Sequence, residues 1–341
     1  MRFIKMKKLK ITLSVIMIIA VIFSFAACAS DTAKPGSSDE AQSTTDEQRE
    51  VKTRVAALNG PTGIGLAKVK TDRAYGYDVT FYNDPQEIVP LLVNGETDIA
   101  AVPLNLAANI YKKTNGGIKI LAINTLGVLH VLEKGDTISS VADLKEKTVF
   151  ATGQGSTPEY TINYILEKNG IDRENDLTVE YKSAHPELAT LAIEGKADIC
   201  ILPEPFASKV IASGKGFRRA LDLTEEWNKV SDAPLAMGCV VARKEYIEAN
   251  PDIISEFMTF NEVSVNFMNT SPSAAVVLAD IGMITPDQVE LYADAIAGCN
   301  IVFIDGEEMK KTAEENFAVL FEADPVSVGG ELPDENIYYP G

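Results

Sequence analysis

Runs of apolar residues alternate with amphipathic stretches along the chain from about residue 51 onward. We predict strands at 51–58, 77–82, 98–102, 119–123, 148–151, 177–181 and 198–202. The stretches between these runs have the apolar spacing of helices, and Gly95 and Gly195 end two of them. Strands that alternate with helices of this length predict an α/β fold with mainly parallel sheets.

Part of this pattern occurs twice, with an offset of 100 residues. Residues 87–110 (EIVPLLVNGETDIAAVPLNLAANI) align without gaps on residues 187–210 (ELATLAIEGKADICILPEPFASKV). Each segment contains a helix, a glycine that ends it, a strand that begins at an aspartate, and a proline that ends the strand. The repeat therefore predicts two similar α/β lobes.

The length of the chain, 341 residues, also favours two lobes over one compact core. We expect residues 51–133 and 236–341 to form the first lobe and residues 134–235 to form the second. The apolar segment 235–247 is expected to return the chain to the first lobe, where the mostly helical remainder packs. Two crossings of this kind would form a hinge.

The first 27 residues have the pattern of a secretory signal. Five basic residues precede an apolar run at 11–23, which is shorter than the roughly 20 residues of a membrane-spanning helix. Ala26 and Ala27 precede Cys28, as in the bacterial lipobox, although Phe25 stands where leucine is usual. We predict a lipid anchor on Cys28; the alternative is an ordinary signal with an incidental cysteine. Residues 28–50 have no large apolar side chain, which predicts a disordered tether.

The charge of the chain argues against two classes of partner. The net charge is −18, and removal of residues 1–27 leaves 26 basic and 49 acidic residues. Nucleic acids and anionic membrane surfaces both select for basic patches, so neither is an expected partner. Attachment to the membrane would then depend on the lipid alone.

Cysteine and histidine are too few and too scattered to indicate a metal or cofactor site. Cys200, Cys239 and Cys299 form no CxxC pair, and the chain has two histidines. We expect three free thiols in or near the core, with a Cys239–Cys299 disulfide as the alternative.

Ligands of open α/β sheets sit beyond the C-terminal ends of the strands. The loops there are rich in Gly, Pro, Ser, Thr and Asn, and they carry no Arg or Lys. The candidate ligand-binding residues are Asn59, Gly60, Pro61, Thr62, Gly63, Pro103, Leu104, Asn105, Asn124, Thr125, Leu126, Gly153, Gln154, Gly155, Ser156, Thr157, Pro158, Ser183, His185, Glu204 and Phe206.

Three of these loop features have a specific chemistry. The glycine loop 153–158 runs into a helix, so it offers free N–H donors, unless Ser156 or Thr157 simply caps the helix. Glu204 would accept hydrogen bonds from a ligand N–H, or it lies in a solvated turn. His185 either faces the cleft or packs at a helix start. No nucleophile is accompanied by both a base and an orienting acid, so no catalytic site is predicted.

The chain resembles the periplasmic-type binding proteins of ABC importers, in particular their nitrate/sulfonate/taurine and pyrimidine-precursor branch. The resemblance lies in the lipobox, the two repeated lobes, a GxxDIxxxP motif at 95–103 and 195–203, and Glu204-Pro205. It implies a type II fold with two crossover strands, and a cleft that closes on a small molecule. It also implies an extracytoplasmic, monomeric protein that delivers its ligand to an ABC permease.

Two other functions remain open: an enzyme on the same two-lobed fold, and a ligand-sensing domain for a membrane receptor. The ligand itself is expected to be small and neutral or weakly charged, because the cleft loops carry no cation. Glu204 then favours a nitrogen-containing organic molecule.

Replacement of Cys28 tests the anchor. Cys28→Ser removes the sulfur that would carry the lipid, so the protein should move from the membrane fraction to the soluble extracytoplasmic fraction. Fractionation of cells that have the lipoprotein pathway measures this. A mutant that stays with the membrane, or a wild-type protein found free, contradicts the prediction.

Overall fold

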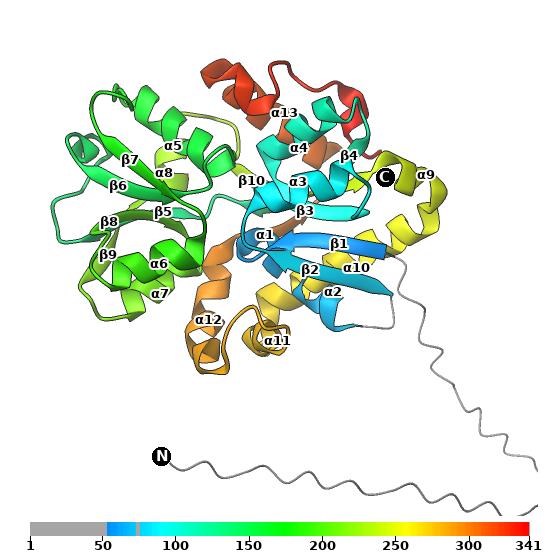
Figure 1. The fold of residues 1–341 in the computed structure, drawn as a ribbon, viewed down its shortest axis with the longest axis horizontal. Coiled ribbons are helices and arrows are strands. Elements are labelled where there is room, and N and C mark those ends of the chain that lie inside the picture. Colours follow the sequence, from blue (N-terminus) through cyan, green and yellow to red (C-terminus); the bar gives the residue numbers. More distant parts are fainter. Residues whose placement is uncertain (1–52, 73–75, 341) are drawn as a thin grey trace, which may run out of the picture. The chain divides into compact units, whose positions relative to one another are not determined.

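The computed structural model describes residues 53–72 and 76–340, which form two α/β lobes (Figure 1). The predicted signal 1–27, Cys28 and the tether 28–50 lie outside the described residues. Each lobe is built on one sheet that has helices on both faces, so the predicted α/β class is confirmed. No helix in the described ranges is both long and apolar enough to cross a membrane.

The sheet of the first lobe has six strands. Their order is β11 (Ile301–Ile304), β4 (Ile118–Leu126), β10 (Ala236–Arg243), β3 (Ile99–Pro103), β1 (Thr53–Leu58) and β2 (Tyr77–Tyr82). Strand β1 pairs in parallel with β2 and β3, whereas β10 is antiparallel to both β3 and β4. On one face lie α3 (Pro85–Val93), α4 (Leu104–Lys113) and α13 (Gly306–Ala323). On the other lie α2 (Ala67–Thr71) and α10 (Pro251–Thr270).

The sheet of the second lobe has five strands. Their order is β7 (Thr178–Lys182), β6 (Thr148–Thr152), β8 (Ile199–Pro203), β5 (Leu129–Lys134) and β9 (Phe217–Asp222). One face is covered by α5 (Thr157–Lys168) and α8 (Leu223–Asn228), whose Trp227 is fully buried. The other face is covered by α6 (His185–Ile193) and α7 (Phe206–Ala212).

The sequence repeat corresponds to a structural repeat. Helices α3 and α6, like strands β3 and β8, have the same lengths and the same offset of 100 residues. Beside β3 lies the antiparallel β10, and beside β8 lies the antiparallel β5. Strand β5 follows a crossing from the first lobe near Gly127. Strand β10 follows a crossing from the second lobe near Pro234.

The position of β5 corrects the expected lobe boundary at residue 133. Leu129–Lys134 pairs with β8 and β9, so it belongs to the second sheet, and the first crossing lies before it. Val131 and Leu132 are buried on opposite faces of that sheet, which explains the continuous apolar run. An apolar run of this kind predicts a buried strand but does not indicate which sheet receives it.

The remainder of the chain is mostly helical, as expected. After β10 the chain forms α9 (Lys244–Ala249) from residues expected to continue the strand. The other elements are α1 (Pro61–Ile64), α11 (Ala274–Asp280), α12 (Val289–Ala295) and short 3₁₀ turns at Val141–Leu144, Pro286–Gln288, Ile296–Cys299, Pro325–Val328 and Glu335–Ile337. Strands β5, β9 and β11 and helix α8 were not predicted.

The three described cysteines are buried and free, so the predicted free thiols are confirmed and the alternative Cys239–Cys299 disulfide is not formed. Burial raises the pKa of the Cys200 thiol to about 12 and also raises the pKa values of Cys239 and Cys299. All three are therefore protonated and unreactive at neutral pH.

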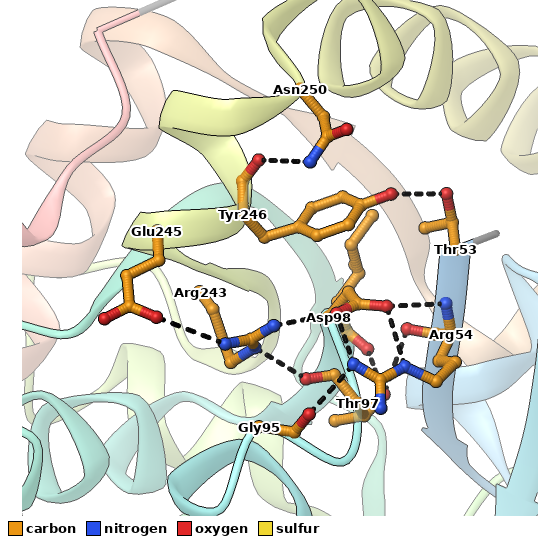
Figure 2. Close-up of polar contacts among 10 residues, drawn as sticks. Thr53, Arg54, Gly95, Thr97, Asp98, Arg243, Glu245, Tyr246 and Asn250 are labelled. Atoms are coloured by element: carbon orange, nitrogen blue, oxygen red, sulfur yellow. Dashed lines mark hydrogen bonds and ion pairs between the residues drawn. The ribbon is translucent and has the colours of Figure 1, made fainter.

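A buried carboxylate joins three strands at the end of the first sheet away from the ligand loops (Figure 2). Asp98 accepts hydrogen bonds from the Arg54 backbone N–H (2.9 Å), the Arg54 guanidinium (2.7 and 3.0 Å) and the Arg243 guanidinium (2.9 Å). Burial alone would raise the pKa of Asp98, but these hydrogen bonds hold it below its ordinary value. The equivalent Asp198 of the second lobe is 67% exposed and lies 3.9 Å from Lys134.

Asp98→Asn and Asp198→Asn form a matched pair of variants. Asp98→Asn should lower the free energy of unfolding by about 2–3 kcal/mol, less than for a fully buried pair because Arg54 is 47% exposed. Asp198→Asn should cost less than about 1 kcal/mol. Urea denaturation at pH 7 measures both, and equal losses would contradict the assignment.

The same interaction has a defined pH dependence. Since the pKa of folded Asp98 lies below its unfolded value of about 3.9, the stabilisation is present at neutral pH and is lost as the pH falls below about 4. The difference in stability between wild type and Asp98→Asn should therefore shrink in acid.

Candidate functional site

A cavity of about 520 Å³ lies between the two lobes at the C-terminal ends of the parallel strands. From the first lobe it is lined by Leu58, Pro61, Thr62, Asn83, Asp84, Pro85, Gln86, Pro103 and Thr125. From the second lobe and the crossings it is lined by Val128, Leu129, Thr152, Gly153, Gln154, Gly155, Ser156, Pro158, Tyr181, Lys182, Ser183, Ala184, His185, Pro203 and Met237. The lining is therefore an apolar frame of Pro, Leu, Val and Met with interspersed polar groups.

The local sequence explains why these loops meet. Each parallel strand leads into a helix, β3 directly and the others through a short loop, and prolines at 61, 85, 158 and 186 occupy the first or second position of four of these helices. Pro103 and Pro203 end the central strands β3 and β8 of the two sheets. The six connections therefore converge where the strands point.

About half of the candidate residues from the sequence line this cavity. They are Pro61, Thr62, Pro103, Thr125, Gly153, Gln154, Gly155, Ser156, Pro158, Ser183 and His185. The others are not part of this lining: Asn59, Gly60, Gly63, Leu104, Asn105, Asn124, Leu126, Thr157, Glu204 and Phe206. Asn59, Gly60 and Phe206 instead line a smaller pocket of about 130 Å³, which shares Asn83 with the cavity.

Asn105 and Thr157 contact each other across the lobes. The Asn105 backbone N–H donates to Thr157 Oγ1 (3.2 Å), and Thr157 Oγ1 lies 3.1 Å from Asn105 Oδ1. The Asn105 amide also donates to the carbonyls of Gly155 (3.3 Å) and Ser327 (3.1 Å). Both side chains are buried, so they join the start of α4 to the start of α5 and hold the Gly155 loop in place.

Asn124 has a similar supporting role inside the first lobe. Its amide donates to the Thr62 carbonyl (2.8 Å), and its Oδ1 accepts from the Thr125 hydroxyl (3.1 Å). Gly63 follows Thr62 in α1, and a Cβ at this position would lie 1.9 Å from the Leu58 carbonyl oxygen. These two residues shape the Pro61–Thr62 wall.

Glu204 is bound by the protein itself. Its carboxylate forms an ion pair with Arg219, accepts from the Ser208 backbone N–H (3.1 Å), and is buried. Arg219 lies on β9, a strand that the sequence pattern did not predict. The sequence left two roles open for Glu204, an acceptor for a ligand N–H and a residue of a solvated turn. Neither role predicted this ion pair.

Several lining residues were missed, and one signal could have found most of them. Asn83, Asp84 and Pro85 precede Ser183, Ala184 and His185 by 100 residues, so the repeat extends into this loop. Thr152 was missed because it was placed at the start of a loop, whereas it is the last residue of β6. Tyr181 was missed although it ends the predicted strand 177–181, and Lys182, the last residue of β7, was placed just after that strand.

The charged groups of the cavity are engaged with the protein. Asp84 caps α3 by accepting from the Gln86 backbone N–H (2.8 Å). The Lys182 ammonium lies 3.1 Å from Glu180 and 5.1 Å from the centre of the Phe150 ring. Burial lowers the pKa of His185 to about 4, so its imidazole is neutral at pH 7. Across the described lining, no cationic side chain is left unpaired.

Helix starts at the cavity are a source of hydrogen-bond donors. Helices α1, α5 and α6 have no side-chain cap, because Gly60 and Ala184 have no capping atom and the Ser156 hydroxyl donates to the Gly153 carbonyl (2.6 Å). Uncapped N–H groups at a helix start carry partial positive charge. The cavity therefore offers donors without a formal charge.

Comparison with known proteins identifies the family. A family model described as "ABC transporter, phosphonate, periplasmic substrate-binding protein" matches residues 69–276, more than half of the chain. The chain belongs to this family. It is thus a solute-binding protein of an ABC importer, as the sequence resemblance predicted. No curated protein matches the sequence significantly.

Solved structures share the fold at low sequence identity. An ABC transporter protein from Parabacteroides distasonis has a TM-score of 0.70 and 23% identity, over 85% of this chain and 99% of its own. The periplasmic aliphatic sulphonate binding protein SsuA from Escherichia coli has a TM-score of 0.63 and 16% identity, over 84% and 95%. The alkanesulfonate-binding protein SsuA from Xanthomonas axonopodis pv. citri, bound to MOPS, has a TM-score of 0.61 and 16% identity, over 80% and 93%.

Glu204→Gln tests whether this carboxylate serves the fold or the ligand. Because it is buried against Arg219, the substitution should lower the free energy of unfolding by about 1–3 kcal/mol. Glu180→Gln is the control: its carboxylate is 48% exposed beside Lys182, so the loss should stay below about 1 kcal/mol. Urea denaturation measures both. An unchanged stability of Glu204→Gln, together with lost ligand binding, would contradict this assignment.

Proposed function

We propose that this chain is a lipid-anchored, extracytoplasmic, monomeric binding protein that captures a small nitrogen-containing organic molecule between its lobes. It would deliver this molecule to the permease of an ABC importer and would not catalyse a reaction. The ligand would contact the lining residues that the sequence also indicated, in particular the Gly153–Pro158 loop, Thr62, Ser183 and His185. The anchor on Cys28 belongs to the proposal, since residues 1–52 lie outside the described part.

The observation that carries the proposal is the cavity between the lobes. Its volume of about 520 Å³ lies within the range of about 300–1,000 Å³ that is usual for small-molecule sites. Both lobes contribute lining, so a bound molecule would hold them together. This is the geometry that a capture-and-release carrier requires.

The electrostatics favour a neutral ligand. An anion moved from water into this cavity would meet neutral donors from helix starts but no unpaired ammonium or guanidinium in the described lining. It would also meet the Asp84 carboxylate. A neutral heterocycle can instead use both kinds of group, because it has N–H donors as well as acceptors.

Asp84, rather than Glu204, now gives the reason to expect nitrogen in the ligand. Glu204 is paired with Arg219, whereas Asp84 lines the cavity. The Asp84 carboxylate caps α3 through the Gln86 N–H and a capping box with Glu87, and it also lines the cavity. A carboxylate oxygen at the cavity wall favours a ligand N–H. The amide oxygens of Asn83, Gln86 and Gln154 have the same preference.

Catalysis has little support. The three described thiols are buried and protonated, and Thr152 is the hydroxyl residue that hydrogen-bonds to an imidazole of the cavity. That imidazole, His185, has no carboxylate partner among the described residues that would orient it as a base.

Native mass spectrometry and titration calorimetry of the mature protein test the function. A nitrogen-containing ligand of zero net charge should be retained from native extract. Cytosine should bind at least tenfold more tightly than methylphosphonate or ethanesulfonate, a difference of about 1.4 kcal/mol. Tighter binding of either anion would contradict the proposed ligand class.

A matched pair of variants locates the site. Ala184→Trp fills the cavity and should abolish retention of the ligand. Val263→Trp adds the same side chain at an exposed position on α10 and should leave retention unchanged. Equal retention by both variants would show that the ligand binds elsewhere.

A further inference from the structure

We infer that Thr152 is a positioning residue: its hydroxyl donates to Nδ1 of His185 and thereby presents the Nε2–H of that ring to a hydrogen-bond acceptor on the ligand. The inference rests on the proposed ligand-binding function of the cavity. It adds Thr152, which the sequence did not indicate, to the site. It also makes His185 a hydrogen-bond donor toward the ligand.

The geometry of the pair is the first step. Thr152 Oγ1 lies 2.6 Å from His185 Nδ1, and both residues line the cavity. Thr152 is the last residue of β6, and His185 is the first residue of α6. The hydrogen bond therefore ties the start of this helix to the neighbouring strand.

The imidazole also has two close neighbours besides Thr152. The ring of Phe206 lies 5.4 Å from it, centre to centre, at an angle of 39° between the planes. A Cβ at Gly60, in the other lobe, would lie 3.8 Å from His185 Cδ2, so backbone packs close to the ring edge. The ring thus has little freedom to turn away from Thr152.

Hydrogen-bond satisfaction decides which atom carries the proton. Thr152 is 3% exposed, and its Oγ1 has no second partner among the residues that the structure describes. If Nδ1–H donated to the hydroxyl oxygen, the buried hydroxyl hydrogen would have no acceptor, which costs about 1–3 kcal/mol. If the hydroxyl donates to Nδ1, every hydrogen of the pair is used. The neutral ring then carries its proton on Nε2.

The Nε2 atom is free to meet a ligand. Nε2 makes no hydrogen bond within the described structure. It is also absent from the fully buried polar atoms without a partner, so part of its surface is exposed. Desolvation lowers the pKa of His185 to about 4, so the ring is neutral at pH 7. It therefore carries no positive charge that would attract anions. A ligand carbonyl oxygen or ring nitrogen is a suitable acceptor for a neutral N–H.

Nitrogen NMR of the two histidines tests the tautomer directly. The chain contains only two histidines, so His130→Gln assigns the ¹⁵N signals of His185. At pH 7 the wild-type protein should show a protonated Nε2 and an unprotonated Nδ1. Thr152→Val keeps the shape of the side chain but removes the hydroxyl, so the signals should move toward a mixture of tautomers. Thr152→Ser should restore the wild-type pattern.

Calorimetry with cytosine connects the tautomer to binding. Thr152→Val should weaken binding about five- to thirtyfold, while Thr152→Ser should stay within about twofold of wild type. A protonated Nδ1 in the wild type, an unchanged pattern in Thr152→Val, or equal cytosine affinity of Thr152→Val and wild type would overturn the inference. If wild type does not bind cytosine, the proposed ligand class fails, and the NMR arm alone decides the role of Thr152.

Discussion

The structure depends on one constraint: each sheet is completed by an antiparallel strand that follows a crossing from the other lobe. Strand β10 fills the first sheet between β3 and β4, and β5 fills the second between β8 and β9. The first crossing has room only for glycine, since a Cβ at Gly127 would lie 2.3 Å from the Thr224 hydroxyl. Beside this crossing, the Glu204 backbone N–H donates to the Val128 carbonyl (3.1 Å). The lobes cannot separate without bending these two segments.

The same two crossings also contribute to the lining of the cavity. Thr125, Val128 and Leu129 flank the first crossing, and Met237 follows the second, so mostly apolar residues line the cavity beside the crossings. The walls come from loops that each lobe contributes separately. The Glu204–Arg219 ion pair lies beside the first crossing, where Glu204 also contacts Val128, and the Asn105–Thr157 contact joins the lobes next to the Gly155 loop. The polar residues beside the cavity are thus divided between those that bind other parts of the protein and those that line the cavity.

The sequence predicted the fold well because the repeat and the apolar runs carry local information. The strand predicted at 77–82 has the observed bounds of β2. The site was predicted less completely, because a loop position does not indicate where its side chain points. Glu204 illustrates this: its role depends on Arg219, which lies on an edge strand whose residues FRRALD lack a continuous apolar run. Lys182 likewise lines the cavity while its ammonium turns back to Glu180.

Divergence between the two halves of the repeat explains the polarity of the site. At one position of the repeat the first lobe has Asp84 and the second has Ala184; at the next, the first has Pro85 and the second has His185. Asp84 caps α3 and places a carboxylate at the cavity, whereas α6 begins without a cap and places a neutral imidazole there. One wall therefore favours hydrogen-bond donors on the ligand, and the opposite wall favours acceptors. With the proposed ligand, two lobes of the same fold would contact opposite sides of one molecule with different polarities, which a symmetric repeat could not do.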